Sequence, residues 1–388
     1  MLAHPADGSV EDILIGQGGV IGDFSFDNQN TFTFNAPAEI FVQSTTTITN
    51  EGTINSAGGT LVNNGSVENN AGGAVTIGAV VFNNQFFEGR LTNNAGATLT
   101  NAAGAALAIE ILANSAGGTF TNNGNAGVND GISQTGGFEQ ATNAGTLANN
   151  PGATLGIISL TNAAGGTLTN AGELGDFGLT NGGTLNNQAG GTLGVFALGF
   201  GTLTNQAGGQ LINNGTLGAD ILMNNAGGTF TNNGNAGVND GISNTGGFEQ
   251  ATNAGTLANN AGATLGIIFL TNAASGTLTN AGALGAFGLT NGGTLNNEAG
   301  GTLGVFALGF GTLTNQAGGQ LINNGTLGAD ILRARRVDTL STFSAGPAQS
   351  VQLIKHAGAA SPAKSSGEDS RRRLWSRMSR SAIRCKRC

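Results

Sequence analysis

The chain has 388 residues, of which only 9% are charged and 39% are hydrophobic, and its formal net charge is −8. Disordered chains combine low hydrophobicity with high charge, and ordinary globular enzymes carry about a quarter of charged residues, so this composition argues against both classes. The 69 glycines stand singly or in pairs at irregular intervals, which excludes collagen. A repetitive structural protein rich in Gly, Asn and Thr remains.

The charge is distributed unevenly along the chain. Residues 1–332 contain 19 acidic residues and a single basic one, Arg90, for a formal charge of −18. Residues 333–388 contain 13 basic and 3 acidic residues, for a charge of +10. We therefore expect two kinds of sequence to meet near residue 332. The acidic part should repel nucleic acid, so no nucleic-acid partner is expected for it.

The N-terminal 44 residues are expected to form an entry segment of β-structure with incomplete first coils. They lack the basic and apolar regions of a signal peptide, and no stretch of about 18 apolar residues occurs in the chain. Residues 45–112 contain irregular copies of a short repeat such as GTLVNN and LTNNAGATLTN. Irregular solenoid coils are predicted there.

Residues 113–222 and 223–332 are a tandem duplication. The two blocks align without gaps and differ at nine of 110 positions. Within each block a unit of the form G-T-L-x-N recurs, starting at Gly145, Gly166, Gly183 and Gly201. These starts are 21, 17 and 18 residues apart, so six coils of about 18 residues are expected in each block.

The unit predicts strands and not helices. Leu flanked by Thr alternates with period two, and Gly, Asn and Pro end each run after three to five residues. Three short strands separated by corners make one coil, and stacked coils form an all-β, right-handed parallel β-helix. Large apolar side chains should point inward and Thr outward, with Gly and Asn in the corners. Asn could also stack as a ladder along the coils.

The sequences GGTLTN, NNGTL and LTNAAGGTLTNAG resemble the repeats of secreted bacterial β-solenoids, namely autotransporter passengers and filamentous-haemagglutinin-like adhesins. The resemblance covers residues 45–332. It implies secretion across the outer membrane through a translocator, display on the cell surface, and a role in adhesion, aggregation or as a stalk. The partners it implies are host or cell-surface molecules, or other copies of the chain.

Catalysis and metal binding need charged or metal-ligating side chains, and few of these occur before residue 333. Before residue 333 there are one Arg, no Lys and one His, His4, and the acidic pair Glu173 and Asp176 becomes alanine in the second block. Catalytic residues and cofactors are therefore not expected. Asp130 and Asp240 lie in Gly/Asn-rich segments that faintly resemble calcium-binding repeats, but a single such Asp in each block predicts a polar loop and not a metal site.

Threonine triplets suggest an alternative function. Thr98–Thr100, Thr119–Thr121, Thr167–Thr169 and Thr202–Thr204 could form a flat threonine face suited to binding ice or carbohydrate. Other coils have TLA, TLN or TLG in the same place, so outward Thr serving simply to favour β-structure is the preferred interpretation.

Some strands carry apolar residues at consecutive positions, so that period-two alternation would send several of them outward. They could form an adhesive apolar patch, but a corner within the runs that turns all of them inward is the preferred interpretation. The residues concerned are Ile158, Phe196, Phe200, Phe269, Phe306 and Phe310.

Residues 333–388 permit three interpretations. Leu374, Trp375, Met378 and Ile383 could line one face of a basic helix that binds a membrane or a partner. Cys385-x-x-Cys388 could be half of a metal or redox site. The loss of Asn and Gly together with the gain of Arg favours the third interpretation, an out-of-frame or disordered tail.

Overall fold

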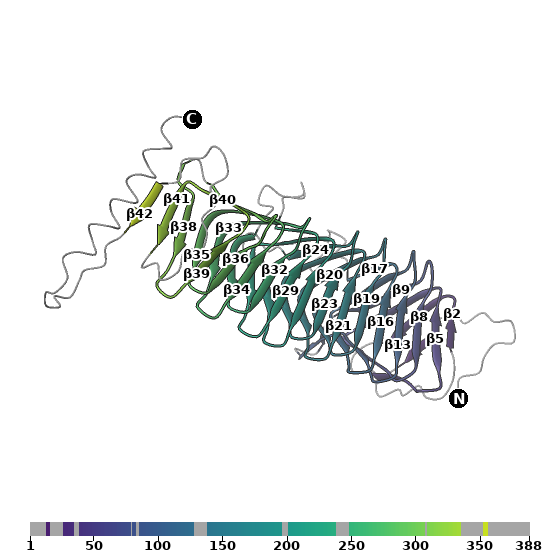
Figure 1. Cartoon of the computed structure of the whole chain (residues 1–388). Coiled ribbons are helices and arrows are strands. Elements are labelled where there is room, and N and C mark those ends of the chain that lie inside the picture. Colours follow the sequence, from purple (N-terminus) through teal and green to yellow (C-terminus); the bar gives the residue numbers. More distant parts are fainter. Residues whose placement is uncertain are drawn as a thin grey trace, which may run out of the picture. The chain divides into compact units, whose positions relative to one another are not determined.

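The chain divides into two compact units, Met1–Ile354 and Lys355–Cys388, in the computed structural model. The structure describes residues 13–15, 26–34, 39–78, 80–82, 85–127, 138–195, 201–237, 248–306, 309–334 and 352–355. These residues form an all-β solenoid whose strands stack in order along the chain (Figure 1). No helix in this described part is long and apolar enough to cross a membrane.

The strands belong to two large parallel sheets. The first has 14 strands: β2 (Phe26–Asn28), β5 (Thr47–Asn50), β8 (Ser66–Asn69), β13 (Thr98–Asn101), β16 (Thr119–Asn122), β19 (Thr146–Asn149), β21 (Thr167–Asn170), β23 (Thr184–Asn187), β26 (Gln210–Asn213), β29 (Thr229–Asn232), β32 (Thr256–Asn259), β34 (Thr277–Asn280), β36 (Thr294–Asn297) and β39 (Gln320–Asn323).

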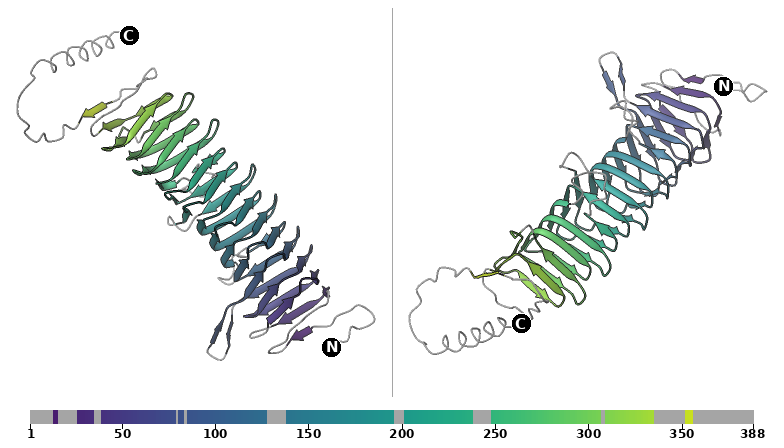
Figure 2. Two further views of the ribbon diagram at one scale, coloured as in Figure 1. Left: turned by 60° about the horizontal axis from the view of Figure 1, so that its bottom comes forward. Right: turned by 90° about the horizontal axis from the view of Figure 1, so that it is seen from above.

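The second sheet has 26 strands and covers the other two sides of each coil. Its strands are β1 (Ile13–Ile15), β3 (Thr31–Phe34), β4 (Glu39–Val42), β6 (Thr53–Ala57), β7 (Thr60–Asn63), β9 (Ala74–Gly78), β12 (Arg90–Asn93), β14 (Ala106–Ile109), β15 (Ile111–Asn114), β17 (Asn125–Ala126), β18 (Phe138–Asn143), β20 (Thr154–Asn162), β22 (Glu173–Asn181), β24 (Thr192–Val195), β25 (Thr202–Asn205), β27 (Thr216–Ala219), β28 (Ile221–Asn224), β30 (Asn235–Ala236), β31 (Phe248–Asn253), β33 (Thr264–Asn272), β35 (Ala283–Asn291), β37 (Thr302–Val305), β38 (Thr312–Asn315), β40 (Thr326–Ala329), β41 (Ile331–Ala334) and β42 (Gln352–Lys355). A separate antiparallel hairpin, β10 (Val80–Phe82) with β11 (Gln85–Phe87), leaves the stack between β9 and β12 (Figure 2).

Each coil has three strand segments, as the sequence predicts. The chain runs from β19 in the 14-stranded sheet into the long strand β20, and then into β21 of the 14-stranded sheet again. Burial alternates along β20 until Ile158 and Ser159, which are both exposed, and then resumes. Two successive outward residues mark a corner, so the single strand β20 supplies two sides of the coil. The prediction of a parallel β-solenoid is confirmed, whereas its right hand stays a prediction.

The coils are longer and less even than expected. Successive strands of the 14-stranded sheet are joined through asparagines 27, 21, 17, 26 and 19 residues apart between Asn122 and Asn232. Five coils therefore fill each block, and the expectation of six shorter coils is wrong. Counting G-T-L motifs overestimates the number of coils, because the motif begins strands on more than one side of a coil. The strands that follow Gly183 and Gly201, for example, belong to different sheets.

The core contains two kinds of inward side chain. In strands such as β21, with the sequence TLTN, burial follows an alternating pattern in which Leu168 and Asn170 are buried while Thr167 and Thr169 are partly exposed. Leu, Ile, Val and Phe stack on the same position of the next coil through the parallel register, as Leu147, Leu168 and Leu185 do. The asparagines lie at strand ends beside the corners, but their side chains point inward.

Two asparagine ladders run along the inside of the solenoid. In each, the Nδ2 group of one asparagine donates to Oδ1 of the asparagine one coil further on, over distances of 2.6–2.9 Å. The first ladder joins Asn28, Asn50, Asn69, Asn101, Asn122, Asn149, Asn170, Asn187, Asn213, Asn232, Asn259, Asn280, Asn297 and Asn323. The second joins Asn63, Asn93, Asn114, Asn143, Asn162, Asn181, Asn205, Asn224, Asn253, Asn272, Asn291 and Asn315.

The ladders also satisfy the remaining amide proton. Asn170 Nδ2, for example, donates both to Asn187 Oδ1 at 2.8 Å and to the carbonyl of Thr192 at 2.9 Å. A buried amide without partners would be costly, whereas one with all its partners gives each coil a fixed register on the next. The predicted ladder is thus present in duplicate, and it lies inside the solenoid.

Beside the ladders only glycine fits, because the Cβ of any other residue would collide with neighbouring atoms. A Cβ at Gly166 would overlap the carbonyl oxygen of Asn143 and Oδ1 of Asn162, whereas a Cβ at Gly165, where φ is +84°, would meet nothing within 4 Å. Position 165 is Ser275 in the second block. We expect Gly166→Ala to destabilise the chain by about 2–3 kcal/mol and Gly165→Ser by less than about 1 kcal/mol. Urea unfolding midpoints of the two variants measure the difference; equal midpoints would contradict it.

Candidate functional site

The acidic pair of the first block, Glu173 and Asp176, does not form a site. Glu173 and Asp176 both lie on β22, but Glu173 is exposed and Asp176 is buried, with 3% of its surface exposed. The alternation of the strand sends them to opposite faces of the sheet. A general acid and a general base must reach one substrate, so this pair cannot perform glycosidase-type chemistry.

Asp176 occupies a place that is otherwise apolar. The register sets it between Ile157 of β20 and Val195 of β24, in the row of inward side chains. Its Oδ1 accepts a hydrogen bond from the N–H of Gly178 at 2.8 Å, while Oδ2 is buried without a partner among the described residues. Desolvation by burial raises the pKa of Asp176 to about 8, and the backbone hydrogen bonds offset only part of that rise.

Three further carboxylates recur at the spacing of the blocks and have a structural role. Two of them are Asp220 and Asp330: Asp220 Oδ2 accepts the N–H of Gly201 at 2.8 Å, and Asp330 Oδ2 accepts the N–H of Gly311 at 2.9 Å. Each carboxylate stands directly before a strand with the sequence I-L and fixes a corner of the preceding coil. This position was not identified from the sequence, although its recurrence from block to block was a usable signal.

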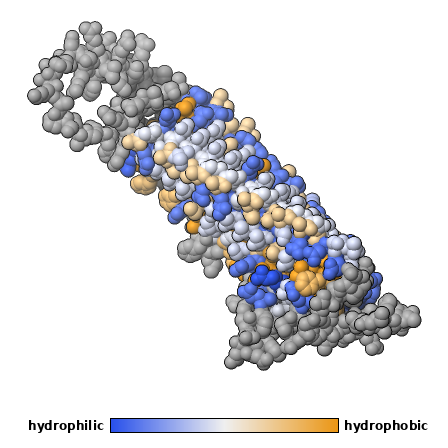
Figure 3. Space-filling view, turned by 90° about the horizontal axis from the view of Figure 1, so that it is seen from below, coloured by the Kyte–Doolittle hydropathy of each residue, from blue (hydrophilic) through white to orange (hydrophobic). Residues whose placement is uncertain are grey.

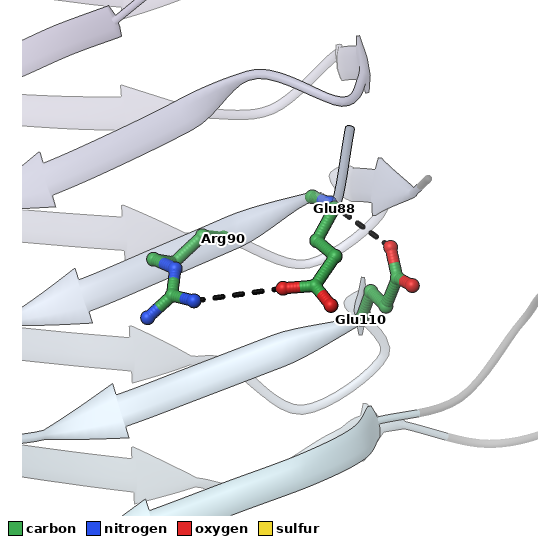
Figure 4. A network of polar contacts seen from close by, with 4 residues as sticks. Glu88, Arg90 and Glu110 are labelled. Atoms are coloured by element: carbon green, nitrogen blue, oxygen red, sulfur yellow. Dashed lines mark hydrogen bonds and ion pairs between the residues drawn. The ribbon is translucent and has the colours of Figure 1, made fainter. Parts of the chain in front are cut away.

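The third carboxylate lies upstream of the duplicated blocks. Glu110 Oε2 accepts the N–H of Gly89 at 2.9 Å, next to the ion pair between Glu88 and Arg90, whose closest atoms are 3.6 Å apart (Figure 4). Glu88 and Arg90 are half exposed, so this pair contributes little to stability. Arg90, the single basic residue of residues 1–332, therefore lies next to the hydrogen bond by which Glu110 fixes a corner.

Metal ligands do not gather within the described residues, where no group of three or more His, Cys, Asp or Glu side chains could hold an ion. Asp130 and Asp240, which sequence analysis weighed for calcium, lie outside the described residues. The same is true of the tail residues Leu374, Trp375, Met378, Ile383, Cys385 and Cys388.

Outward threonines align across neighbouring strands, including strands that lack a Thr-x-Thr triplet. In the 14-stranded sheet the first outward position aligns Thr119, Thr146, Thr167 and Thr184 directly across four strands. The second outward position is mixed, since Thr169 pairs with Asn186 there. One continuous column of hydroxyls is present, and a regular two-column lattice is not found on these strands.

The predicted apolar residues lie on the outside wherever the structure describes them. Ile158, Phe269, Phe306 and Phe310 are exposed by 47, 60, 38 and 78%, respectively. A corner does fall inside these runs, but it turns these four side chains outward, so the preferred interpretation, in which the corner turns them inward, is wrong for them. Phe196 and Phe200 lie outside the described residues.

Three further apolar side chains are exposed and were not predicted from the sequence, namely Phe177, Met223 and Phe287. Phe177 lies on β22 between the inward residues Leu174 and Leu179. Two inward residues five positions apart require one break in the alternation, and that break is the corner that carries the phenylalanine. This spacing was the signal available in the sequence.

Apolar side chains recur at this corner in neighbouring coils. The register pairs on either side place exposed Ile158 level with Phe177 in the first block, and half-buried Ile268 level with Phe287 in the second. One strand further on, the N–H of Phe306 donates to the carbonyl of Ala286, the residue before Phe287. We call Phe269, Phe287, Phe306 and Phe310 the block 2 patch.

Glycines allow the rings of the block 2 patch to lie against the backbone. A Cβ at Gly288 would lie 2.9 Å from Cδ1 of Phe269, and one at Gly328 would lie 2.5 Å from Cζ of Phe306. Those rings cover positions where any larger residue would collide with them. The face drawn in Figure 3 shows apolar side chains in small separate groups among hydrophilic and neutral residues.

No family model matches the chain, and no curated protein sequence matches it. Among solved structures, the chain is similar to a fragment of TibA hyper-glycosylated by TibC, with 16% identity and a TM-score of 0.29, over 81% of this chain and 98% of that one. The strand pairing, and not this likeness, defines the fold as a parallel β-solenoid.

Proposed function

We propose that the chain is a non-enzymatic part of a secreted bacterial surface protein, a passenger or stalk segment that acts in adhesion or aggregation. The observation that carries the proposal is the row of exposed apolar side chains at one corner, with Phe177 and Phe287 exposed by 55 and 54%. Large exposed apolar side chains gathered in register are typical of interaction surfaces. The dispersed and buried carboxylates described above support a role without catalysis.

Surface display tests the proposal. The full chain, fused to an unrelated display carrier on a non-aggregating bacterium, is expected to cause cell aggregation or attachment to host cells or apolar surfaces. A display control with Phe177→Ser and Phe287→Ser should lose most of that effect, because both side chains are largely exposed and the fold does not need them. Normal display without aggregation or attachment would refute the function.

The aligned threonine column favours a second candidate, a module that binds ice or carbohydrate. Direct pairing of Thr146 with Thr119 and Thr167 repeats a hydroxyl once per coil, at about 4.8 Å along the solenoid. Purified protein should then show thermal hysteresis or retention on a glycan array, and Thr146→Val with Thr167→Val should weaken it. An absence of both signals removes this candidate.

A further inference from the structure

The two strands that form the apolar corner in block 2 differ from their counterparts in block 1. Three of the nine differences between the blocks lie on β33 and β35, and all three remove polarity: Ser159 becomes Phe269, Glu173 becomes Ala283 and Asp176 becomes Ala286. Ala286 is buried, whereas Phe269 and Ala283 are exposed. The second block has therefore gained an exposed ring and lost an exposed carboxylate on the same two strands.

The four residues of the block 2 patch lie on β35 and on or next to the strands beside it. Phe269 covers Gly288, and Phe287 precedes Gly288 in the strand. The N–H of Phe306 donates to the carbonyl of Ala286, and its ring lies against Gly328 one coil further on. Phe310 stands just before β38, whose Thr312 pairs with Gly288. Three neighbouring coils thus contribute the four exposed rings.

Phe310 is held in place by backbone contacts. The N–H groups of Gly309 and Gly311, on either side of it, both donate to Asp330 Oδ2, at 3.1 and 2.9 Å. Since Phe310 is 78% exposed, this clamp presents the ring to solvent and does not bury it. The backbone that carries Phe310 therefore has less conformational freedom to lose when a partner covers it.

Space beside the rings is open. The outward positions of β35 read Ala283, Gly285 and Phe287, and a Cβ at Gly285 would meet nothing within 4 Å. In the first block the same row reads Glu173, Gly175 and Phe177. A shallow strip of backbone flanks the rings in both blocks, but only in block 2 is its border uncharged.

The charge change indicates the chemistry of the occupant. A basic partner would be favoured by a glutamate at position 283, so its loss argues for an apolar partner. Residues 1–332 carry a formal charge of −18, and two copies of this chain repel one another wherever their carboxylates meet. A contact in which the patch faces itself gains most from losing the glutamate, because each copy would otherwise oppose its own charge. Glu249, next to Ile268 in the register, has its counterpart in Glu139 and does not distinguish the blocks.

The size of the patch fits a weak dimer. A phenylalanine side chain offers about 200 Å², so rings exposed by 60, 54, 38 and 78% present on the order of 450 Å². A stable interface buries about 800 Å² on each partner. The patch can supply about half of that, and the flanking glycine strip can add contact area.

We propose that the block 2 patch is a self-association surface, on which the patch of a second copy docks in a two-fold symmetric contact. This deepens the proposed function by naming the partner as the chain itself. The same patch on both copies makes the contact isologous, so it closes as a dimer. Because the patch supplies only about half of the area of a stable interface, the dimer is expected to be weak and its population to depend on protein concentration.

Exchanging residues between the blocks tests the proposal without risk to the fold. Phe269→Ser with Ala283→Glu gives block 2 the exposed residues of block 1, and Ser159→Phe with Glu173→Ala does the reverse. The full chain and both variants are measured by sedimentation equilibrium at low and high salt. The first variant should weaken dimerisation by about tenfold or more, and the second should create a further patch and larger oligomers.

Salt separates this contact from an electrostatic one. Screening weakens the repulsion between acidic solenoids, so dimerisation through the patch should strengthen with salt. Association of the basic residues 333–388 of one copy with the acidic body of another should weaken with salt, and that result would overturn the proposal. A chain that stays monomeric, or dimers unaffected by Phe269→Ser with Ala283→Glu, would also overturn it. Adhesion of displayed cells to other surfaces would then still support the proposed function.

Discussion

Asn187→Asp is expected to destabilise the protein by about 3–5 kcal/mol near neutral pH. Asn187 Nδ2 donates to Asn213 Oδ1 and to the carbonyl of Thr216, both at 2.8 Å, and Oδ1 accepts from Asn170 at 2.8 Å. An aspartate of the same shape keeps the acceptor but replaces both donors with a buried charge facing two oxygens. The free energy of unfolding, from guanidinium titration followed by circular dichroism, measures the loss.

The neighbouring residue provides the matched control. Asn186 lies on the same strand but points outward, and its Oδ1 accepts a hydrogen bond from Asn214 at 3.0 Å. Asn186→Asp keeps that acceptor at a half-buried surface position, so a change of less than about 1 kcal/mol is expected. The defect of Asn187→Asp should shrink at low pH, where a protonated carboxyl can donate one hydrogen bond. Equal effects of the two substitutions would show that the ladder does not stabilise the solenoid.

The strand and ladder architecture was accessible from the sequence because its signals are local. Alternation in TLTN predicts a strand, and the recurrence of Asn at its end predicts a ladder. The inward direction of Asn was harder to predict, because asparagine usually prefers corners and solvent. Only a full set of partners, such as Asn187 and Thr192 for the amide of Asn170, makes its burial favourable.

The coil length and the apolar corner could not be predicted from the repeat alone. G-T-L motifs begin strands on different sides of a coil, so counting them overestimates the number of coils. Ile158 and Phe177 face outward at a bend in β20 and β22 that lies between two register pairs, Ile157 with Asp176 and Ser159 with Gly178. No glycine, asparagine or proline occupies the position of Ile158 to signal the bend. The interpretation with inward apolar side chains was physically reasonable, and the exposure of Ile158 and Phe177 themselves decides against it.

Asp176→Ala is expected to stabilise the protein at neutral pH by about 3–5 kcal/mol, which would be unusual for a core substitution. Burial raises the pKa of Asp176 from 3.8 to about 8, so the folded chain keeps a proton that the unfolded chain releases. Well below pH 3.8 both states are protonated, so the ionisation of this group no longer changes the stability. Between pH 3.8 and about 8 the free energy of unfolding falls with rising pH, by at most about 1.4 kcal/mol per unit.

The second block supplies the reciprocal experiment. Ala286 sits between Ile267 and Val305 at the position that Asp176 occupies between Ile157 and Val195, so an alanine already packs there in the same fold. Asp176→Ala should flatten the decline of stability between pH 4 and pH 8, and Ala286→Asp should add a second decline of similar size. Unfolding titrations at four pH values measure both slopes. If the free energy of unfolding depended on pH in the same way for the wild type and Asp176→Ala, the carboxyl of Asp176 would be ionised in the folded protein at neutral pH. The row of inward side chains would then hold a charge that its apolar neighbours, Ile157 and Val195, cannot solvate.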